Sequence, residues 1–118
     1  MQKILIVEDE EKLGKIYRGH LERSGFEARL SPTISSVRDF SPDLILLDHG
    51  LPDEELDGIE LIPQTKKRFP EAKIVVFSNY SPFELRDRAL AAGADDYWVK
   101  VDLSLKNLLE RVQTLLGS

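Results

Sequence analysis

The sequence predicts an α/β fold with a doubly wound parallel sheet of five strands and five helices. Short apolar segments alternate along the chain with segments of helical period, and this alternation is typical of strand-helix-strand units. The segments 3–7, 44–47 and 73–77 are almost wholly apolar, as expected of strands that helices bury on both faces. In a sheet of this kind the carboxyl ends of all strands lie along one edge, where ligands bind.

Two helices are predicted in the first half of the chain. Tyr17 and Leu21 belong to one apolar stripe of a helix that Gly25 ends. A short strand over 26–30 follows, and a brief helix is then predicted over 31–40, opened by a Ser-Pro-Thr sequence. The residues of this second helix that we expect to turn inward are Ile34, Val37 and Phe40.

A third helix is predicted after Asp57, and it should run to Phe69. Pro63 lies inside this pattern, and proline both lacks a backbone donor and clashes with the preceding helical turn. We therefore expect either a kink at Pro63 or a helix that starts late enough to place this proline in its first turn.

The last two helices have clear start and stop signals. The segment 81–84 has the sequence of a capping box with proline at the first helical position, so a fourth helix should run to Ala92 with Gly93 after it. A fifth strand is predicted over 96–99. The final helix, 104–116, has a wide apolar stripe, and Ser104 can cap it.

Composition excludes several classes of function. We expect one domain over residues 1–118, a length that can bury a core without cross-links. The absence of cysteine excludes a disulfide framework, thiolate metal sites and thiol catalysis. A net charge of −5 without a basic run argues against nucleic-acid binding. No segment approaches the roughly 20 apolar residues of a membrane span, so we expect a soluble cytoplasmic protein with no membrane partner.

Five polar residues follow the predicted strands at equivalent positions. They are Glu8 and Asp9 after the first strand, Asp48 after the third, Ser78 after the fourth and Lys100 after the fifth. Each has an ordinary explanation when it is taken alone: an aspartate often opens a loop, and acids complement a helix start. Together they place three carboxylates, a hydroxyl and an ammonium at one sheet edge. Clustered carboxylates repel one another unless a cation relieves them, and Mg²⁺ with its oxygen ligands fits such a site.

The chain resembles the receiver domain of two-component response regulators over essentially its whole length. The resemblance lies in the acidic pair at 8–9, the D-x-x-L-P pattern that starts at Asp48, the Ser78 hydroxyl, the Gly-Ala-Asp-Asp-Tyr run over 93–97, and Lys100 three residues after Tyr97. It implies a flavodoxin-like fold with strand order 2-1-3-4-5.

The resemblance also implies an activity. Asp48 would accept a phosphoryl group from a phosphohistidine on a sensor histidine kinase or a phosphotransfer protein. Asp9, Asp48 and the Gly50 carbonyl would bind Mg²⁺ directly, and Glu8 would act through water. The chain would then catalyse only its own phosphoryl transfer and autodephosphorylation, so we do not expect an enzyme that acts on a separate substrate.

The switch that the resemblance implies joins Ser78 to Tyr97. Lys100 would neutralise one phosphoryl oxygen and Ser78 would donate a hydrogen bond to another. As Ser78 moves, Tyr97 would swing inward and change the surface formed by the fourth helix, the fifth strand and the fifth helix, which an unidentified downstream protein would bind. Trp98 alternates to the other side of its strand and is expected to lie in the core.

Three features depart from the receiver pattern. The connection over 31–40 is shorter than usual, so its helix should be stunted, and the loop over 53–57 is longer and more acidic than the typical Pro-x-x-Asp-Gly. Receivers usually place a proline with a cis peptide bond after the lysine, but here the residue is Val101. Because a cis bond before a non-proline residue costs ~3–4 kcal/mol, we predict a trans bond and a less rigidly directed Lys100.

Two other interpretations remain open at this point. A pseudo-receiver would keep the fold and bind a partner without phosphorylation, and the presence of every required side chain argues against it. A phosphatase with an aspartate nucleophile normally carries a second acid two residues after the first, and Gly50 at that position argues against this class.

Overall fold

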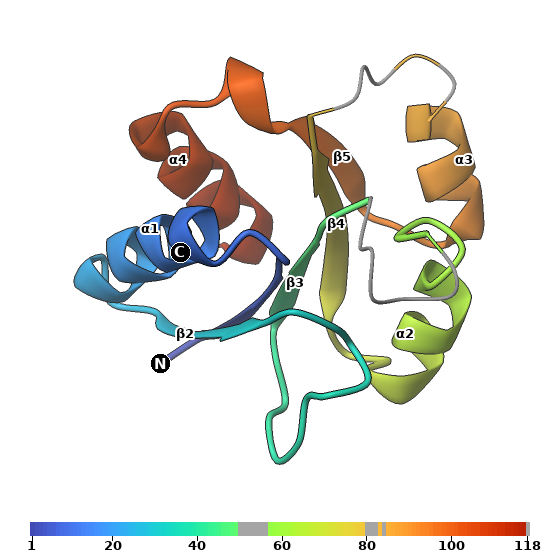
Figure 1. Cartoon of the computed structure of the whole chain (residues 1–118), viewed down its shortest axis with the longest axis horizontal. Helices are drawn as coiled ribbons and strands as arrows, with labels where there is room; N and C mark the ends of the chain where they lie inside the picture. The colour runs from blue at the N-terminus through green and yellow to red at the C-terminus, as the bar shows by residue number, and fades with distance from the viewer. Residues whose placement is uncertain (50–56, 80–82, 84, 118) are drawn as a thin grey trace.

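The computed structural model describes residues 1–49, 57–79, 83 and 85–117. Its centre is a five-stranded sheet in which every neighbouring pair of strands is parallel and the order is β2-β1-β3-β4-β5 (Figure 1). The number and order of strands therefore confirm the prediction. The strands are β1 (Lys3–Val7), β2 (Glu27–Ser31), β3 (Leu44–Leu47), β4 (Lys73–Ser78) and β5 (Asp96–Val99).

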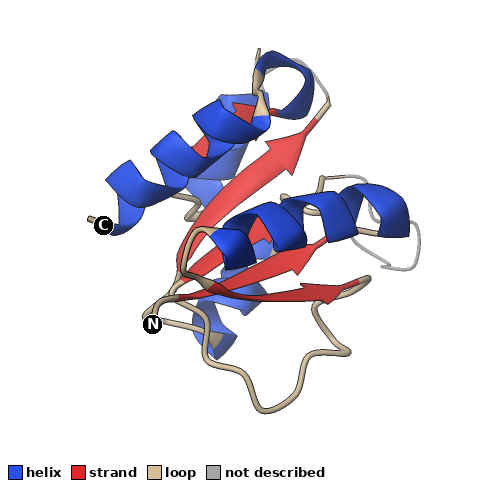
Figure 2. Ribbon diagram, turned by 90° about the vertical axis from the view of Figure 1, so that its left-hand side faces the viewer, coloured by secondary structure: helices blue, strands red, loops and turns tan. Residues whose placement is uncertain are grey.

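Among the described residues, four α-helices cover the sheet, two on each face (Figures 1 and 2). Helices α1 (Glu11–Arg23) and α4 (Leu105–Leu116) lie on one face, and α2 (Ile62–Arg68) and α3 (Leu85–Ala92) lie on the other. A short 3₁₀ turn, η1 (Lys100–Asp102), joins β5 to α4. In the part of the chain that is described, no helix is both long and apolar enough to cross a bilayer.

The alternation of side chains along the strands produces two cores. Leu5 and Val7 of β1 pack under α2 and α3, whereas Ile4 and Ile6 pack under α1 and α4. Successive residues of a strand point to opposite faces, so a strand covered on both sides is apolar at every position. Tyr97 and Trp98 divide in the same way, Tyr97 into the first core and Trp98 into the second, which confirms that Trp98 is a core residue.

The register aligns the carboxyl ends of the strands. Val7 of β1 is the partner of Leu47 of β3, so the chains leave these neighbouring strands at the same level. The N–H of Asp48 still donates to the Val7 carbonyl at 3.0 Å. On the other side of β3, Ser78 ends β4 opposite Val99, and Lys100 follows directly. The sheet therefore presents its polar residues along one edge.

The prediction of a helix over 31–40 is wrong. Ser31 ends β2 and the residues after it form a turn and bends but no helix, although Ile34, Val37 and Phe40 are buried as expected of the apolar residues of this segment. The Ser36 N–H donates to the Thr33 hydroxyl at 3.2 Å, as at a helix N-cap, and the Val37 N–H donates to the Ile34 carbonyl at 3.2 Å. The turn does not continue, because Asp39 has a φ of 54°, outside the helical region. Arg68 of α2 donates to the carbonyls of Ile34 and Val37. The short connection is thus held by side chains, and the described chain has four α-helices rather than five.

The helix and loop signals are otherwise largely confirmed. Pro63 occupies the second position of α2, so the helix starts late rather than kinking. The Ser104 hydroxyl accepts from the Asn107 N–H at 3.1 Å and caps α4. The peptide bond between Lys100 and Val101 is trans, as predicted. The capping box over 81–84 lies largely outside the described residues.

Candidate functional site

Three carboxylates meet at the carboxyl edge of the sheet. Glu8 and Asp9 follow β1 and Asp48 follows β3, and one oxygen from each lies within 4.8 Å of the others. Glu8 is buried, Asp48 is partly exposed and Asp9 is exposed. Because β1 and β3 are adjacent and in register, the fold brings these acids together although 38 residues separate the two aspartates.

Lys100 supplies the counter-charge. Its ammonium donates a hydrogen bond to Glu8 Oε1 and lies 3.6 Å from Asp48 Oδ2. The other oxygen of Glu8 accepts the backbone N–H of Glu10 at 3.2 Å, so both oxygens of this buried acid have partners. A buried ion pair is stable only when its remaining hydrogen-bonding groups are satisfied, and this condition holds for Glu8.

Ser78 completes the polar end of the site. It is the last residue of β4, is buried, and lines a pocket of about 240 Å³ at the sheet edge. Tyr97 lies one strand further along and is buried in the core under α3, so it does not line this pocket. Gly50, the predicted carbonyl ligand, is outside the described residues. The pocket is lined by Glu8, Asp9, Glu10, Asp48, Ser78, Asn79 and Lys100.

The residues present fit a hard divalent cation. Three carboxylates face one ammonium, so negative charge is in excess, and oxygen is the donor type that Mg²⁺ prefers. Asp9 is exposed, which leaves room for the water molecules that Mg²⁺ retains.

Two aromatic residues support the site, and the sequence did not single them out. The rings of Tyr17 on α1 and Phe77 on β4 are 5.1 Å apart at 60°. Burial, and then the negative charges of Glu8, Glu10 and Asp48, raise the pKa of Tyr17 to about 12. The helical stripe of Tyr17 indicated only that it would be buried, because a hydrophobic pattern carries no information about which groups lie beyond the helix.

Gly58 is a third residue whose role only the structure reveals. A Cβ atom at this position would lie 2.3 Å from the Asp48 carbonyl oxygen and 2.8 Å from His49 Cα. The Gly58 N–H donates to the His49 carbonyl at 2.7 Å. The peptide that follows Asp48 therefore packs directly on Gly58. The only sequence signal was the Asp-Gly pair at the end of the acidic loop.

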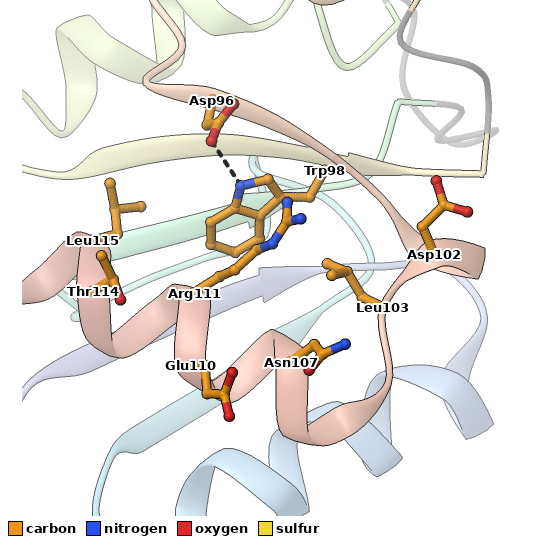
Figure 3. Close-up of a pocket in the computed structure, with 9 residues that line it drawn as sticks. All are labelled: Asp96, Trp98, Asp102, Leu103, Asn107, Glu110, Arg111, Thr114 and Leu115. Atoms are coloured by element: carbon orange, nitrogen blue, oxygen red, sulfur yellow. Dashed lines mark hydrogen bonds between the residues drawn. The ribbon is translucent and has the colours of Figure 1, made fainter.

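A larger pocket, of about 480 Å³, lies away from the acids between β5 and α4 (Figure 3). On its floor the Trp98 indole N–H donates to Asp96 Oδ2 at 2.9 Å, and the Arg111 guanidinium lies 5.9 Å from the indole ring centroid. Arg86 of α3 also donates to Asp96, at 2.7 Å. Burial alone would raise the pKa of Asp96, but the bonds from Tyr97 N–H, Trp98 and Arg86 together lower it. Asp96 thus ties α3 to β5.

The fold and the site together define a receiver-type protein: a parallel sheet of order 2-1-3-4-5 with acids, a hydroxyl and a lysine at its carboxyl edge. Comparison with known proteins agrees. The family model of the response regulator receiver domain matches residues 4–113, and the chain belongs to this family.

Curated relatives are longer than this chain. The phosphate regulon transcriptional regulatory protein PhoB of Rhizobium meliloti is 37% identical over 98% of the chain and 52% of its own length. The KDP operon transcriptional regulatory protein KdpE of Escherichia coli is 40% identical over 85% of the chain and 45% of its own length. The chain therefore spans about half the length of these relatives.

Solved structures share the fold. A CheY-like response regulator receiver domain protein from Methanospirillum hungatei superposes with a TM-score of 0.88 and 29% identity, over 99% of this chain and 94% of that one. A response regulator from Thermotoga maritima gives a TM-score of 0.85 and 26% identity, over 100% and 99% of the two chains.

The raised pKa of Tyr17 predicts a loss of stability in alkali. In the folded protein the pKa of the Tyr17 phenol is raised to about 12, from 10.0 for a free tyrosine. The contribution of the protonated Tyr17 phenol to the free energy of unfolding should therefore be complete below pH 10 and should be lost as the pH rises through 12. Urea unfolding across this range measures it. Tyr17→Phe keeps the ring without the ionising group, so this variant should lose less stability over the same range; an equal loss would contradict the assignment.

The close contact at Gly58 predicts that a methyl group is not tolerated there. Gly58→Ala should lower the free energy of unfolding by about 1–3 kcal/mol, because backbone atoms of 48–49 must move. Gly19→Ala is the matched control, since its new Cβ meets only the flexible end of Arg23 and the helix gains up to about 1 kcal/mol. Urea denaturation of both variants measures the difference, and a neutral Gly58→Ala would refute the packing argument.

Proposed function

We propose that the chain is the phosphorylation-activated switch of a two-component system, with Asp48 as the acceptor. The observation that supports this most is the position of Asp48: its carboxylate is partly exposed beside the Lys100 ammonium, 3.6 Å away, and two further acids. The donor would be a phosphohistidine on a sensor histidine kinase or a phosphotransfer protein. Such a kinase presents its histidine to the cytoplasm, which is where we expect the chain to act.

The chemistry follows from the side chains at the edge of the sheet. An Asp48 oxygen attacks phosphorus, the bond from phosphorus to the histidine nitrogen breaks, and its electron pair returns to the imidazole. Lys100 balances the negative charge that Asp48 gains, and the Ser78 hydroxyl can donate to a phosphoryl oxygen. Mg²⁺, held by Asp9 and Asp48 with Glu8 acting through water and the Gly50 carbonyl completing the set, would neutralise charge on the phosphoryl group. Water later hydrolyses the acyl phosphate, so the chain catalyses only its own phosphorylation and dephosphorylation.

The output would be the surface formed by α3, β5 and α4. We infer that Ser78 moves toward the phosphoryl group and that Tyr97 fills the space it leaves, a local change that shifts a two-state packing equilibrium. Three of the large apolar side chains that the described residues expose belong to these elements or their connections: Phe83 shortly before α3, Leu90 on α3 and Val101 in η1. A downstream protein that buries them would distinguish the two states. PhoB and KdpE are transcriptional regulators, so control of transcription in a longer protein is one such output.

Acetyl phosphate tests the phosphoacceptor and separates the switch from a pseudo-receiver. With Mg²⁺ present, the wild-type protein should gain the mass of one phosphoryl group, and Asp48→Asn should gain none. Intact-protein mass spectrometry measures both. A wild-type protein that stays unmodified under conditions that phosphorylate a known receiver would favour the pseudo-receiver interpretation.

Asp9→Ala tests the cation site. It removes one of three mutually repelling acids, so the fold should persist with equal or greater stability, while the Mg²⁺ affinity falls by at least about 10-fold. Calorimetry with Mg²⁺ and urea unfolding measure the two effects. Glu71→Ala is the control, because it removes one exposed negative charge before β4, at the other end of the sheet. Unchanged Mg²⁺ affinity in Asp9→Ala would refute the ligand assignment.

A further inference from the structure

The Lys100 ammonium has a third partner besides its two carboxylates. It lies over the ring of Phe77, 5.7 Å from the ring centroid. The face of an aromatic ring carries partial negative charge and attracts a cation within about 6 Å, most strongly where water is excluded. Phe77 is 3% exposed and Lys100 is 9% exposed, so this contact is nearly dry. Phe77 directly precedes Ser78 on β4, so its ring lies in the core next to the candidate site, although it does not line the pocket there.

The Phe77 ring is itself held in place. Tyr17 of α1 packs against it with ring centroids 5.1 Å apart and planes tilted by 60°, a geometry that aromatic pairs favour. Both residues belong to the core under α1 and α4. The Tyr17 and Phe77 rings therefore join α1 to β4, and the Phe77 ring faces the Lys100 ammonium.

The backbone around Lys100 supplies little of this positioning. Lys100 opens the three-residue turn η1, and the next residue, Val101, is 76% exposed and so anchors nothing. A lysine side chain has four rotatable carbons and a compact charge, and it takes the position that its partners impose. The expectation that valine after the lysine leaves Lys100 less rigidly directed stays a prediction; in this structure the ammonium contacts Glu8 and Phe77.

We propose that Phe77, supported by Tyr17, is the positioning residue that keeps the Lys100 ammonium beside Asp48. The ring differs from Glu8 in one respect that matters for a phosphoryl-transfer site. Glu8 holds the ammonium only while its own carboxylate is free of other cations, whereas the ring is neutral and attracts the ammonium in every charge state of the acids. Lys100 can then exchange Glu8 for a phosphoryl oxygen without leaving the site. The exchange of Glu8 for a phosphoryl oxygen rests on the proposed phosphoacceptor function, whereas the position of the ammonium over the Phe77 ring does not depend on it.

An NMR measurement on the metal-free protein tests the position directly. The ring current of Phe77 should shift the ε-methylene protons of Lys100 upfield of those of the exposed Lys12 and Lys15. The shift should disappear in Phe77→Leu and persist in Phe77→Tyr, which keeps the ring. Phe26→Leu is the matched control, because Phe26 is buried in the same core and is not a contact of Lys100. A Lys100 shift that is equal in wild type and Phe77→Leu would overturn the proposal.

Reaction with acetyl phosphate and Mg²⁺ tests the consequence. Phe77→Leu should slow phosphorylation by roughly 2- to 30-fold relative to Phe26→Leu, the range expected from losing one cation–π contact. Phe77→Tyr should restore the rate, and the Mg²⁺ affinity should be unchanged in all three variants. Equal slowing in Phe77→Leu and Phe26→Leu would mean a general packing effect and would overturn the positioning role. If the wild-type protein is not phosphorylated at all, the proposed function is refuted instead. The NMR shift then tests only the position of Lys100.

Discussion

Repulsion among three carboxylates is the constraint around which this structure is arranged. One oxygen each of Glu8, Asp9 and Asp48 lies within 4.8 Å of the others, and like charges this close repel one another unless cations compensate them. Lys100 compensates part of this negative charge by binding Glu8 and approaching Asp48, and the remaining excess makes the same place suitable for Mg²⁺.

The parallel sheet is what holds these charges together against their repulsion. β1 and β3 are two of the three inner strands of the sheet, and their apolar residues are almost completely buried. Removing these strands from register would expose both cores at once, so the carboxylates at their ends cannot separate without a large loss of buried apolar surface. The burial of Leu44–Leu47 thus supports the acid that follows them. Gly58 adds a local constraint, because the peptide after Asp48 packs where any side chain would clash.

Strand β5 connects this charged edge to a separate part of the surface. Its residues alternate between two environments: Tyr97 packs into the core beneath α3, and Trp98 packs into the core beneath α4. Asp96 binds Arg86 of α3 and the Trp98 indole, while Arg111 of α4 lies over the same indole. A shift of β5 therefore changes contacts on both neighbouring helices. Lys100 directly follows this strand, so the ammonium at the acids and the α3–β5–α4 surface belong to one continuous segment.

The sequence by itself determined the fold class, all five strands and the acids at their carboxyl ends. These features are local: an apolar run such as Leu44–Leu47 encodes a buried strand, and the residue after it must lie at the sheet edge. Only the tertiary structure decided the rest. In place of a helix over 31–40 the structure has a turn whose Ile34 carbonyl accepts a hydrogen bond from Arg68, a residue distant in sequence. The placement of Lys100 depends on Glu8 and on the Tyr17 and Phe77 rings, which come from three different elements. A periodic pattern indicates which face of an element is buried, but not which side chains of other elements contact that face. The chemistry of this site depends on those contacts.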